Sequence, residues 1–278
     1  MSRKPVKEPA LRRPRSLIWP GALLLMASWF VALLVTAPIT LIPVSRLALP
    51  PGVALVPLGG TVWHGQWRLN SPRAPAMTIQ TDFLPLSIIR LQPAWHVRAQ
   101  TAARASQPDM GLSLAADVGL GFKQLNVRNL HGRLAADSPL IAALTAWPLN
   151  GLIDFSGDAS LIRTKSGFDL KAARAMANWR NAAITTTEPL FLGDLVLDAK
   201  IAQGQLKATI KPASGSRGPL LGELNLAGLW PVTTAPKVSG YLQATAGASE
   251  AFRQQLNLLG HPDASGKITI QGVMPGRY

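Results

Sequence analysis

The stretch that decides the fold reads LVLDAKIAQGQLKATIK and runs from Leu195 to Lys211. On either side of Gln203-Gly204, leucine, alanine and isoleucine recur at every second position, with other residues between them. Alternation with a period of two is typical of a β-strand that buries one face. A glycine between two such runs supplies the positive φ that a tight turn needs. This stretch therefore predicts an antiparallel β-hairpin.

The same kind of pattern continues along the chain in both directions. Short alternating runs occur at Met110–Ala116, Leu152–Phe155, Leu221–Leu226 and Lys267–Gln271. A glycine opens several such runs, at Gly132, Gly151, Gly222, Gly240 and Gly266. The irregular spacing of these units favours stacked hairpins of one curved sheet over a solenoid of fixed period. One-sided alternation predicts a mainly β chain with an antiparallel sheet, not a doubly wound parallel sheet.

Two segments predict short helices. Pro139–Trp147 and Ser249–Leu259 would each form about three turns at most. The second segment begins with a serine and ends before Gly260, which are the residue types that helix capping favours. We expect these helices to cover the ends of the sheet or an edge strand.

The N-terminal region predicts a membrane anchor. Leu17–Ala37 is 21 residues long and carries no charge, and about 20 helical residues span a hydrocarbon core of roughly 30 Å. Six Lys or Arg residues and a single acid precede it. The positive-inside rule then makes residues 1–16 a cytoplasmic basic tail, residues 17–38 a single transmembrane helix and residues 39–278 a β-rich domain on the far side. The candidate anchor residues are Leu17, Trp19, Leu24, Trp29, Phe30, Leu34 and Ala37.

Two other interpretations of this region are less favoured. A cleaved signal peptide usually has an apolar run of about 7–15 residues, and a cut after Ala37 would place Pro38 beside the scissile bond. A buried core helix is disfavoured because a helix that is apolar on every face needs lipid or a large surrounding core. The length of the run favours a retained anchor.

The composition offers little for catalysis. The chain has 278 residues without a cysteine, and its four histidines lie far apart, so no thiolate, metal or cofactor site is predicted. The nucleophile motif G-x-S-x-G is absent. Asp154 and Asp158 flank Gly157 and are expected to solvate a turn. We therefore predict a protein that is not an enzyme.

The charge is strongly basic, with 28 Lys and Arg against 14 Asp and Glu, a net charge of +14. Dispersed cations outside the cytoplasm disfavour nucleic acid as a partner. Attraction to anionic lipid headgroups is one alternative. A solvated basic sheet face is the favoured interpretation, because no cluster of cations is visible in the sequence.

The strongest local motif is LGGTVWHGQW at residues 58–67, in which Thr61, Trp63 and Trp67 are predicted to share one side. Two tryptophans on one sheet face are usually core residues, and a contact with a partner protein is the alternative. The residues that we single out as family motif or interface are Gly60, Thr61, Trp63, Gly65 and Trp67.

These features together resemble a known family, type II secretion system protein N. The resemblance rests on the basic tail, the single anchor and the order of three segments. They are LPPGVALVPLGGTVWHGQW at Leu49–Trp67, PLFLGDLVLDAKIAQGQLKATI at Pro189–Ile210, and LNLLGHPDASGKITIQG at Leu256–Gly272. The chain is also similar to the large lipid-associated periplasmic β proteins typified by AsmA, which have a curved sheet behind one anchor.

The resemblance implies a single-pass protein of the Gram-negative inner membrane, with its N-terminus in the cytoplasm and its β domain in the periplasm. It implies no catalytic activity and no cofactor, and a role in exporting folded proteins across the outer membrane. Its partners would be other inner- and outer-membrane components of the secretion system, with lipids contacted through the anchor. The alternative is an AsmA-like protein that binds or transfers lipid on the apolar face of its sheet. The oligomeric state is left open.

Overall fold

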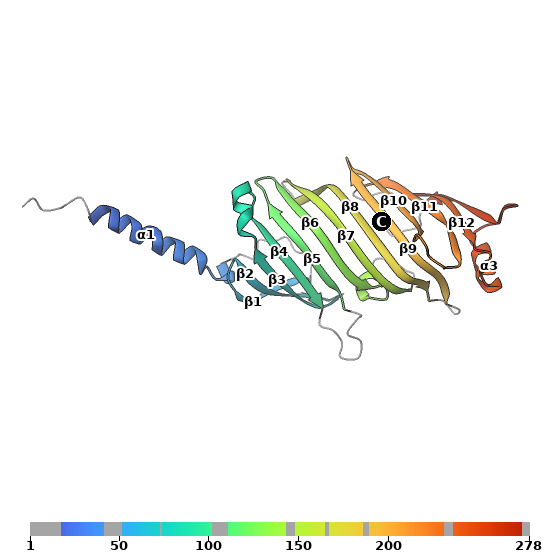
Figure 1. Ribbon diagram of the computed structural model, residues 1–278, viewed down its shortest axis with the longest axis horizontal. Helices are drawn as coiled ribbons and strands as arrows, with labels where there is room; N and C mark the ends of the chain where they lie inside the picture. Colours follow the sequence, from blue (N-terminus) through green and yellow to red (C-terminus); the bar gives the residue numbers. More distant parts are fainter. Residues whose placement is uncertain are drawn as a thin grey trace, which may run out of the picture.

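The computed structural model describes residues 18–41, 52–72, 74–101, 111–142, 148–164, 167–185, 189–230 and 236–273. They form one open antiparallel sheet of 13 strands, in which each strand pairs with its neighbours in the chain from β1 to β13 (Figure 1). The strands are β1 (Ala54–Gly60), β2 (His64–Ser71), β3 (Ala74–Phe83), β4 (Ala94–Thr101), β5 (Ser113–Leu120), β6 (Gln124–Ala135), β7 (Leu149–Thr164), β8 (Gly167–Ile184), β9 (Leu190–Ala202), β10 (Gln205–Pro212), β11 (Leu220–Leu229), β12 (Lys237–Ala244) and β13 (Lys267–Val273). The predicted curved antiparallel sheet is confirmed.

Helices lie at both ends of this sheet (Figure 1). At these ends are α1 (Ile18–Val35), with the 3₁₀ turn η1 (Ile39–Leu41) after it, and α3 (Glu250–Asn257). Between strands lie the 3₁₀ turn η3 (Pro85–Arg90), which joins β3 to β4, and α2 (Pro139–Ala142), which follows β6. In the described part of the chain, none of these helices has the combination of length and apolarity that a membrane span requires.

The hairpin predicted at Leu195–Lys211 is confirmed. Strands β9 and β10 pair from Leu195↔Pro212 to Ala202↔Gln205, which leaves a two-residue turn. Gln203 and Gly204 have φ values of 53° and 72°. Two consecutive positive φ angles are what a type I′ turn requires, and this turn matches the right-handed twist of the flanking strands.

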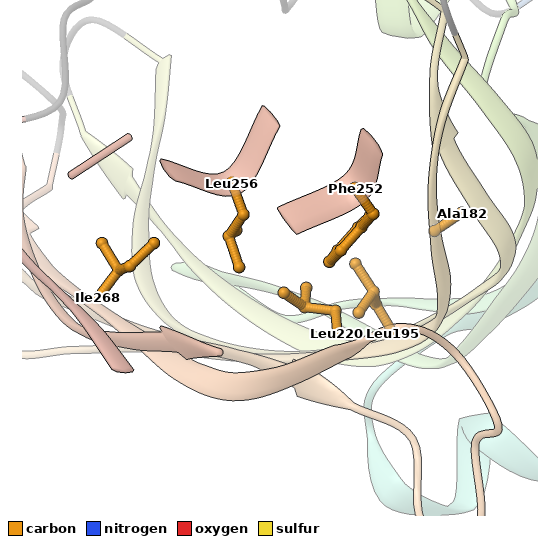
Figure 2. Packing of buried hydrophobic residues seen from close by; sticks show 6 residues of the cluster. All are labelled: Ala182, Leu195, Leu220, Phe252, Leu256 and Ile268. Atoms are coloured by element: carbon orange, nitrogen blue, oxygen red, sulfur yellow. The ribbon is translucent and has the colours of Figure 1, made fainter. Parts of the chain in front are cut away.

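Both predicted helices are present, one of them described only in part. Helix α3 is confirmed with its predicted cap, because the Ser249 hydroxyl accepts a hydrogen bond from the backbone N–H of Phe252. As predicted, it covers one end of the sheet: it lies over the concave face, and its buried residues form one cluster with Ile268 of the edge strand β13 (Figure 2). Helix α2 begins at Pro139 as predicted and is described as far as Ala142, and residues 143–147 lie outside the described residues.

Two strand predictions need correction. Strand β5 begins at Ser113, later than the predicted run, whose first residue Met110 lies outside the described residues. Gly132, Gly151, Gly222 and Gly240 lie inside strands β6, β7, β11 and β12 instead of opening them, whereas Gly266 directly precedes β13 as predicted. At Gly132 a Cβ would lie 2.6 Å from the ring of Phe155, its cross-strand partner. The missing side chain therefore makes room for an aromatic ring on the neighbouring strand.

The concave face is apolar from one edge of the sheet to the other. Helix α3 identifies this face, because Phe252 and Leu256 pack on Leu195 and Leu220 (Figure 2). One continuous line of directly paired residues crosses all 13 strands on this face and contains no polar side chain. It consists of Pro57, Trp67, Ile79, Ala99, Leu114, Gly132, Phe155, Ala177, Leu197, Ile210, Leu224, Gly240 and Ile270.

Candidate functional site

The motif at residues 58–67 contains the end of β1, the turn of residues 61–63 and the start of β2. The backbone N–H of Thr61 donates to the carbonyl of His64 at 2.9 Å. The Thr61 hydroxyl accepts from the backbone N–H groups of Trp63 at 3.3 Å and His64 at 3.1 Å. A short hydroxyl side chain is suited to this arrangement, which satisfies the turn's own backbone donors. The threonine therefore fixes the shape of the turn.

This turn holds the chain that leaves helix α1. The backbone N–H of Val62 donates to the carbonyl of Ala37 at 2.9 Å, and Pro38 pairs with Thr61 in an isolated antiparallel bridge. Ile39 follows and is only 2% exposed. We call this contact between residues 37–41 and the motif the joint. It attaches the end of α1 to the first hairpin of the sheet.

Two of the three motif glycines, Gly60 and Gly65, are needed for close approach. Gly60 has a φ of +100°, and a Cβ there would meet the carbonyl oxygen of His64. A Cβ at Gly65 would meet the Cδ1 atom of Ile39 and would lie 2.9 Å from the Thr81 hydroxyl. Gly65 therefore provides the space that Ile39 occupies.

Aromatic rings support the joint from the concave side. The rings of Trp63 and Phe83 meet edge to face with centroids 4.6 Å apart, and Phe83 meets Trp95 in the same way at 5.4 Å. The indole N–H of Trp95 donates to the carbonyl of Val62 at 3.2 Å. Trp67 is 6% exposed, whereas Trp63 is half-buried. These rings pack within the protein, as the core interpretation of the motif requires.

Sequence reasoning missed Ile39 of the joint and the two rings that support it, Phe83 and Trp95. Each belongs to a different segment, and the turn of residues 60–65 brings them together. No local motif marks them, although Ile39 directly follows the predicted anchor. Of the predicted anchor residues, Leu24, Trp29 and Phe30 have exposed side chains on α1. Leu17 lies outside the described residues, as do the side chains of Trp19 and Leu34, and Ala37 lies in the joint.

We expect Gly65→Ala to lower the free energy of unfolding by about 1–3 kcal/mol, because the added methyl group overlaps Ile39. Thermal unfolding of the full chain followed by circular dichroism measures this effect. Gly272→Ala is the matched control, since a Cβ there meets nothing within 4 Å. Equal melting temperatures for the two variants would show that Gly65 does not need to stay small.

The opposite, convex face carries a line of mostly acidic and basic side chains that we call the polar row. It begins within the motif at His64 and takes one residue from each strand through paired positions. Its members from β2 to β12 are His64, Asp82, His96, Asp117, Arg128, Asp158, Arg174, Lys200, Lys207, Ala227 and Lys237. At β6 the row crosses a bulge, where the backbone N–H of Asn129, next to Arg128, donates to Asp158.

The first part of the polar row is a network of close partners. His64 Nδ1 lies 3.1 Å from Asp82, and His96 Nδ1 lies 2.7 Å from Asp117. The Asn129 amide also donates to Asp117 at 2.7 Å. Burial raises the pKa of Asp117, but the hydrogen bonds from His96 and Asn129 outweigh burial and leave the pKa below its ordinary value. Carboxylates therefore balance the basic groups here.

The expectation that Asp154 and Asp158 solvate a turn is wrong. Both lie in the middle of β7 on the convex face, because the strand runs on through Gly157 to Thr164. Asp154 accepts from Arg133 Nε at 2.7 Å and forms an ion pair with Arg180. Burial raises the pKa of Asp154, but the two guanidinium groups outweigh it and hold the pKa below its ordinary value of 3.8. These acids are structural partners of neighbouring groups on β6 and β8.

A depressed pKa in the folded state makes the stabilisation by Asp154 present at neutral pH and lost as the pH falls through that pKa. We expect Asp154→Asn to cost about 1 kcal/mol at pH 7, a modest value because both arginines are about half exposed. The difference from the wild type should begin to shrink as the pH falls below about 4, the ordinary pKa of Asp, and should be lost once the pH is below the depressed pKa of the folded state. Urea unfolding at several pH values measures it, and a difference that stays constant down to pH 2 would contradict the assignment.

Among the described residues, no group of three or more His, Asp or Glu side chains is arranged to hold a metal ion. Residues 51–271, from just before β1 into β13, match the family model described as "Type II secretion system (T2SS), protein N". This protein is therefore a component of a protein-secretion machine. The chain belongs to the family of type II secretion system protein N. No curated protein and no solved structure matches it.

Proposed function

We propose that this protein is a non-enzymatic inner-membrane component of the type II secretion system that supports export of folded proteins by protein–protein contacts in the periplasm. The observation that carries the proposal is the family match, which covers nearly the whole sheet. An open sheet with two edge strands, β1 and β13, supports a binding role. A partner strand can add to such an edge through main-chain hydrogen bonds. Other components of the secretion system are the proposed partners.

The proposal includes a membrane anchor at residues 17–38 and a cytoplasmic tail at residues 1–16. Its support is the uncharged run Leu17–Ala37, which extends beyond α1 at both ends, and the six cations that precede it. On α1 the apolar side chains are well exposed, with Leu25 at 73% and Phe30 at 65%. A helix with exposed apolar side chains on all sides is stable in lipid. The sheet would then lie in the periplasm.

In this arrangement the joint has a mechanical role. It binds the residues that follow α1 to the first hairpin through two backbone contacts and the buried Ile39. The sheet then extends away from α1 along the long axis of the molecule (Figure 1). The joint thereby sets the direction in which the sheet presents its surfaces to partners.

We expect the full chain to stay in the membrane pellet after alkaline carbonate washing, because a transmembrane helix resists extraction whereas a peripheral protein does not. Immunoblotting of pellet and supernatant measures the distribution, with a chain shortened to residues 39–278 as control. Release of the intact full chain into the supernatant would contradict the anchor.

The secretion role has its own test. Deleting the gene in its native bacterium should leave the substrates of the type II system in the periplasm, and the wild-type gene should restore their release. Activity of a secreted enzyme in culture medium and in periplasmic extract measures this. Normal release from the deletion strain would contradict the proposed function.

One observation favours a second candidate, an AsmA-like lipid-binding role. The concave face is apolar across all 13 strands, and α3 covers only its C-terminal end. Such a trough has the chemistry to shelter acyl chains. Native mass spectrometry of the detergent-exchanged protein decides the matter: phospholipid retained at near one-to-one ratio supports this candidate, and protein without lipid opposes it.

A further inference from the structure

The polar row changes character halfway across the sheet. From β2 to β7 its basic residues alternate with Asp82, Asp117 and Asp158. From β8 to β12 it contains no acid. Its members on these strands are the four cations Arg174, Lys200, Lys207 and Lys237, with Ala227 between the last two. We call these four cations the cationic row. The contrast lies within one line of the same sheet, so general basicity of the chain does not explain it.

The cationic row is unfavourable for folding. Arg174 is paired directly with Lys200, and Lys200 with Lys207. Side chains at directly opposite positions have Cβ atoms about 4.5–5.5 Å apart, and like charges there are destabilising. All three side chains are exposed, and within the described part of the chain none has a carboxylate at ion-pair distance. An anionic partner would relieve this repulsion.

A hollow beside the row indicates what kind of partner fits. It has a volume of 440 Å³ on the convex face, and Lys200, Lys207 and Lys211 line it together with Met176. Met176 is 42% exposed, so the hollow combines cations with an apolar contact. The acids Asp198 and Glu223 also line it, and Glu223 already accepts a hydrogen bond from Asn225. A protein segment with acidic and apolar side chains complements this combination better than a layer of headgroups does.

The distance between the cationic row and α1 also favours a protein partner over a membrane surface. Strand β8 lies seven strand spacings from β1, which is about 34 Å at about 4.8 Å per spacing. Charge attraction to a membrane surface is screened beyond about 8 Å at physiological salt. If α1 anchors the chain as proposed above, the headgroups of that membrane are out of reach of the cationic row.

We propose that the cationic row and its hollow form a docking surface for an acidic segment of another protein. The inference rests on the proposed function for the location of that partner, and it deepens the proposal by naming the surface and the chemistry of its ligand. The charges on the row carry the recognition, and Met176 accepts an apolar side chain of the partner.

Lys200→Glu tests the inference sharply, because it restores the alternation of basic and acidic side chains in the row. The introduced carboxylate would lie between Arg174 and Lys207, so the variant should be as stable as the wild type or more stable. The probe is a fluorescein-labelled decaglutamate peptide, and fluorescence anisotropy with the full chain in detergent measures its Kd. We expect the Kd to rise about tenfold while the melting temperature does not fall.

The matched control is Arg68→Glu, which changes the net charge equally on an exposed convex position of β2. Arg68 is paired with Val56 and Thr78 and lies outside the cationic row. The Kd of the Arg68→Glu variant for the peptide should differ less than twofold from that of the wild type. Equal weakening by both variants would overturn the inference, since binding would then follow net charge alone.

Vesicles containing phosphatidylglycerol form a third arm of the experiment. Loss of vesicle binding in Lys200→Glu with unchanged peptide binding would also overturn the inference, because the row would then recognise headgroups. None of these outcomes depends on the secretion phenotype of the deletion strain, so the two proposals fail separately.

Discussion

Trp67→Ala should lower the free energy of unfolding by about 3–5 kcal/mol, the range for removing a large buried aromatic side chain. The ring is 6% exposed and lies on β2 between Pro57 and Ile79 on the neighbouring strands. Its indole nitrogen also lies beside Gly65, close to the position of Ile39. Removal of the ring therefore leaves a cavity next to the joint.

Urea unfolding followed by far-ultraviolet circular dichroism measures this loss in the full chain. Trp63→Ala is the informative comparison, because Trp63 is half-buried and should cost less than Trp67 when truncated. If Trp63→Ala cost more than Trp67→Ala, the burial assigned to the two rings would be wrong. If Trp63→Ala left stability unchanged and abolished secretion, its ring would be a contact for a partner instead of core.

Phe252→Ala should cost about 3–5 kcal/mol at the other end of the sheet. Phe252 is 5% exposed and joins α3 to a cluster of buried residues that includes Leu195 and Leu220 (Figure 2). An eight-residue helix is not stable alone in water, so α3 depends on this contact. We expect α3 to detach in the variant.

Hydrogen exchange measured by mass spectrometry locates the effect. Amides of α3 and of β11 to β13 should lose protection, while β2 to β4 keep theirs. Leu258→Ala is the control, because Leu258 directly follows the helix and is 86% exposed. A loss of protection over the whole sheet in Phe252→Ala would show that the two ends unfold together.

Two local signals in the sequence were sufficient for a correct prediction. The hairpin at Leu195–Lys211 was predictable because the alternation and the Gln203-Gly204 turn lie within one short segment. The cap at Ser249 was predictable for the same reason. The glycines inside strands were misplaced because glycine is also the residue of turns, and only the register shows that Gly132 faces Phe155.

The site was not predictable in the same way. The joint depends on Ile39 reaching the space at Gly65, a contact between segments whose relative position only the fold determines. The polar row depends on the register of every strand from β2 to β12, including the bulges at Ala115/Asp117 and Val127/Leu130. A shift of one residue in any strand would move its member to the other face. For this reason the cations looked dispersed in the sequence.

In the sheet, each of the 13 strands pairs only with its neighbours in the chain. This order affects how the length of the sheet can change during evolution. No strand is inserted between two others, so gaining or losing one hairpin would shift the rest without repacking it. Each such event would change the span by about 10 Å. Related chains with more or fewer hairpins would therefore differ in how far they extend from α1, and the architecture behaves as an adjustable spacer.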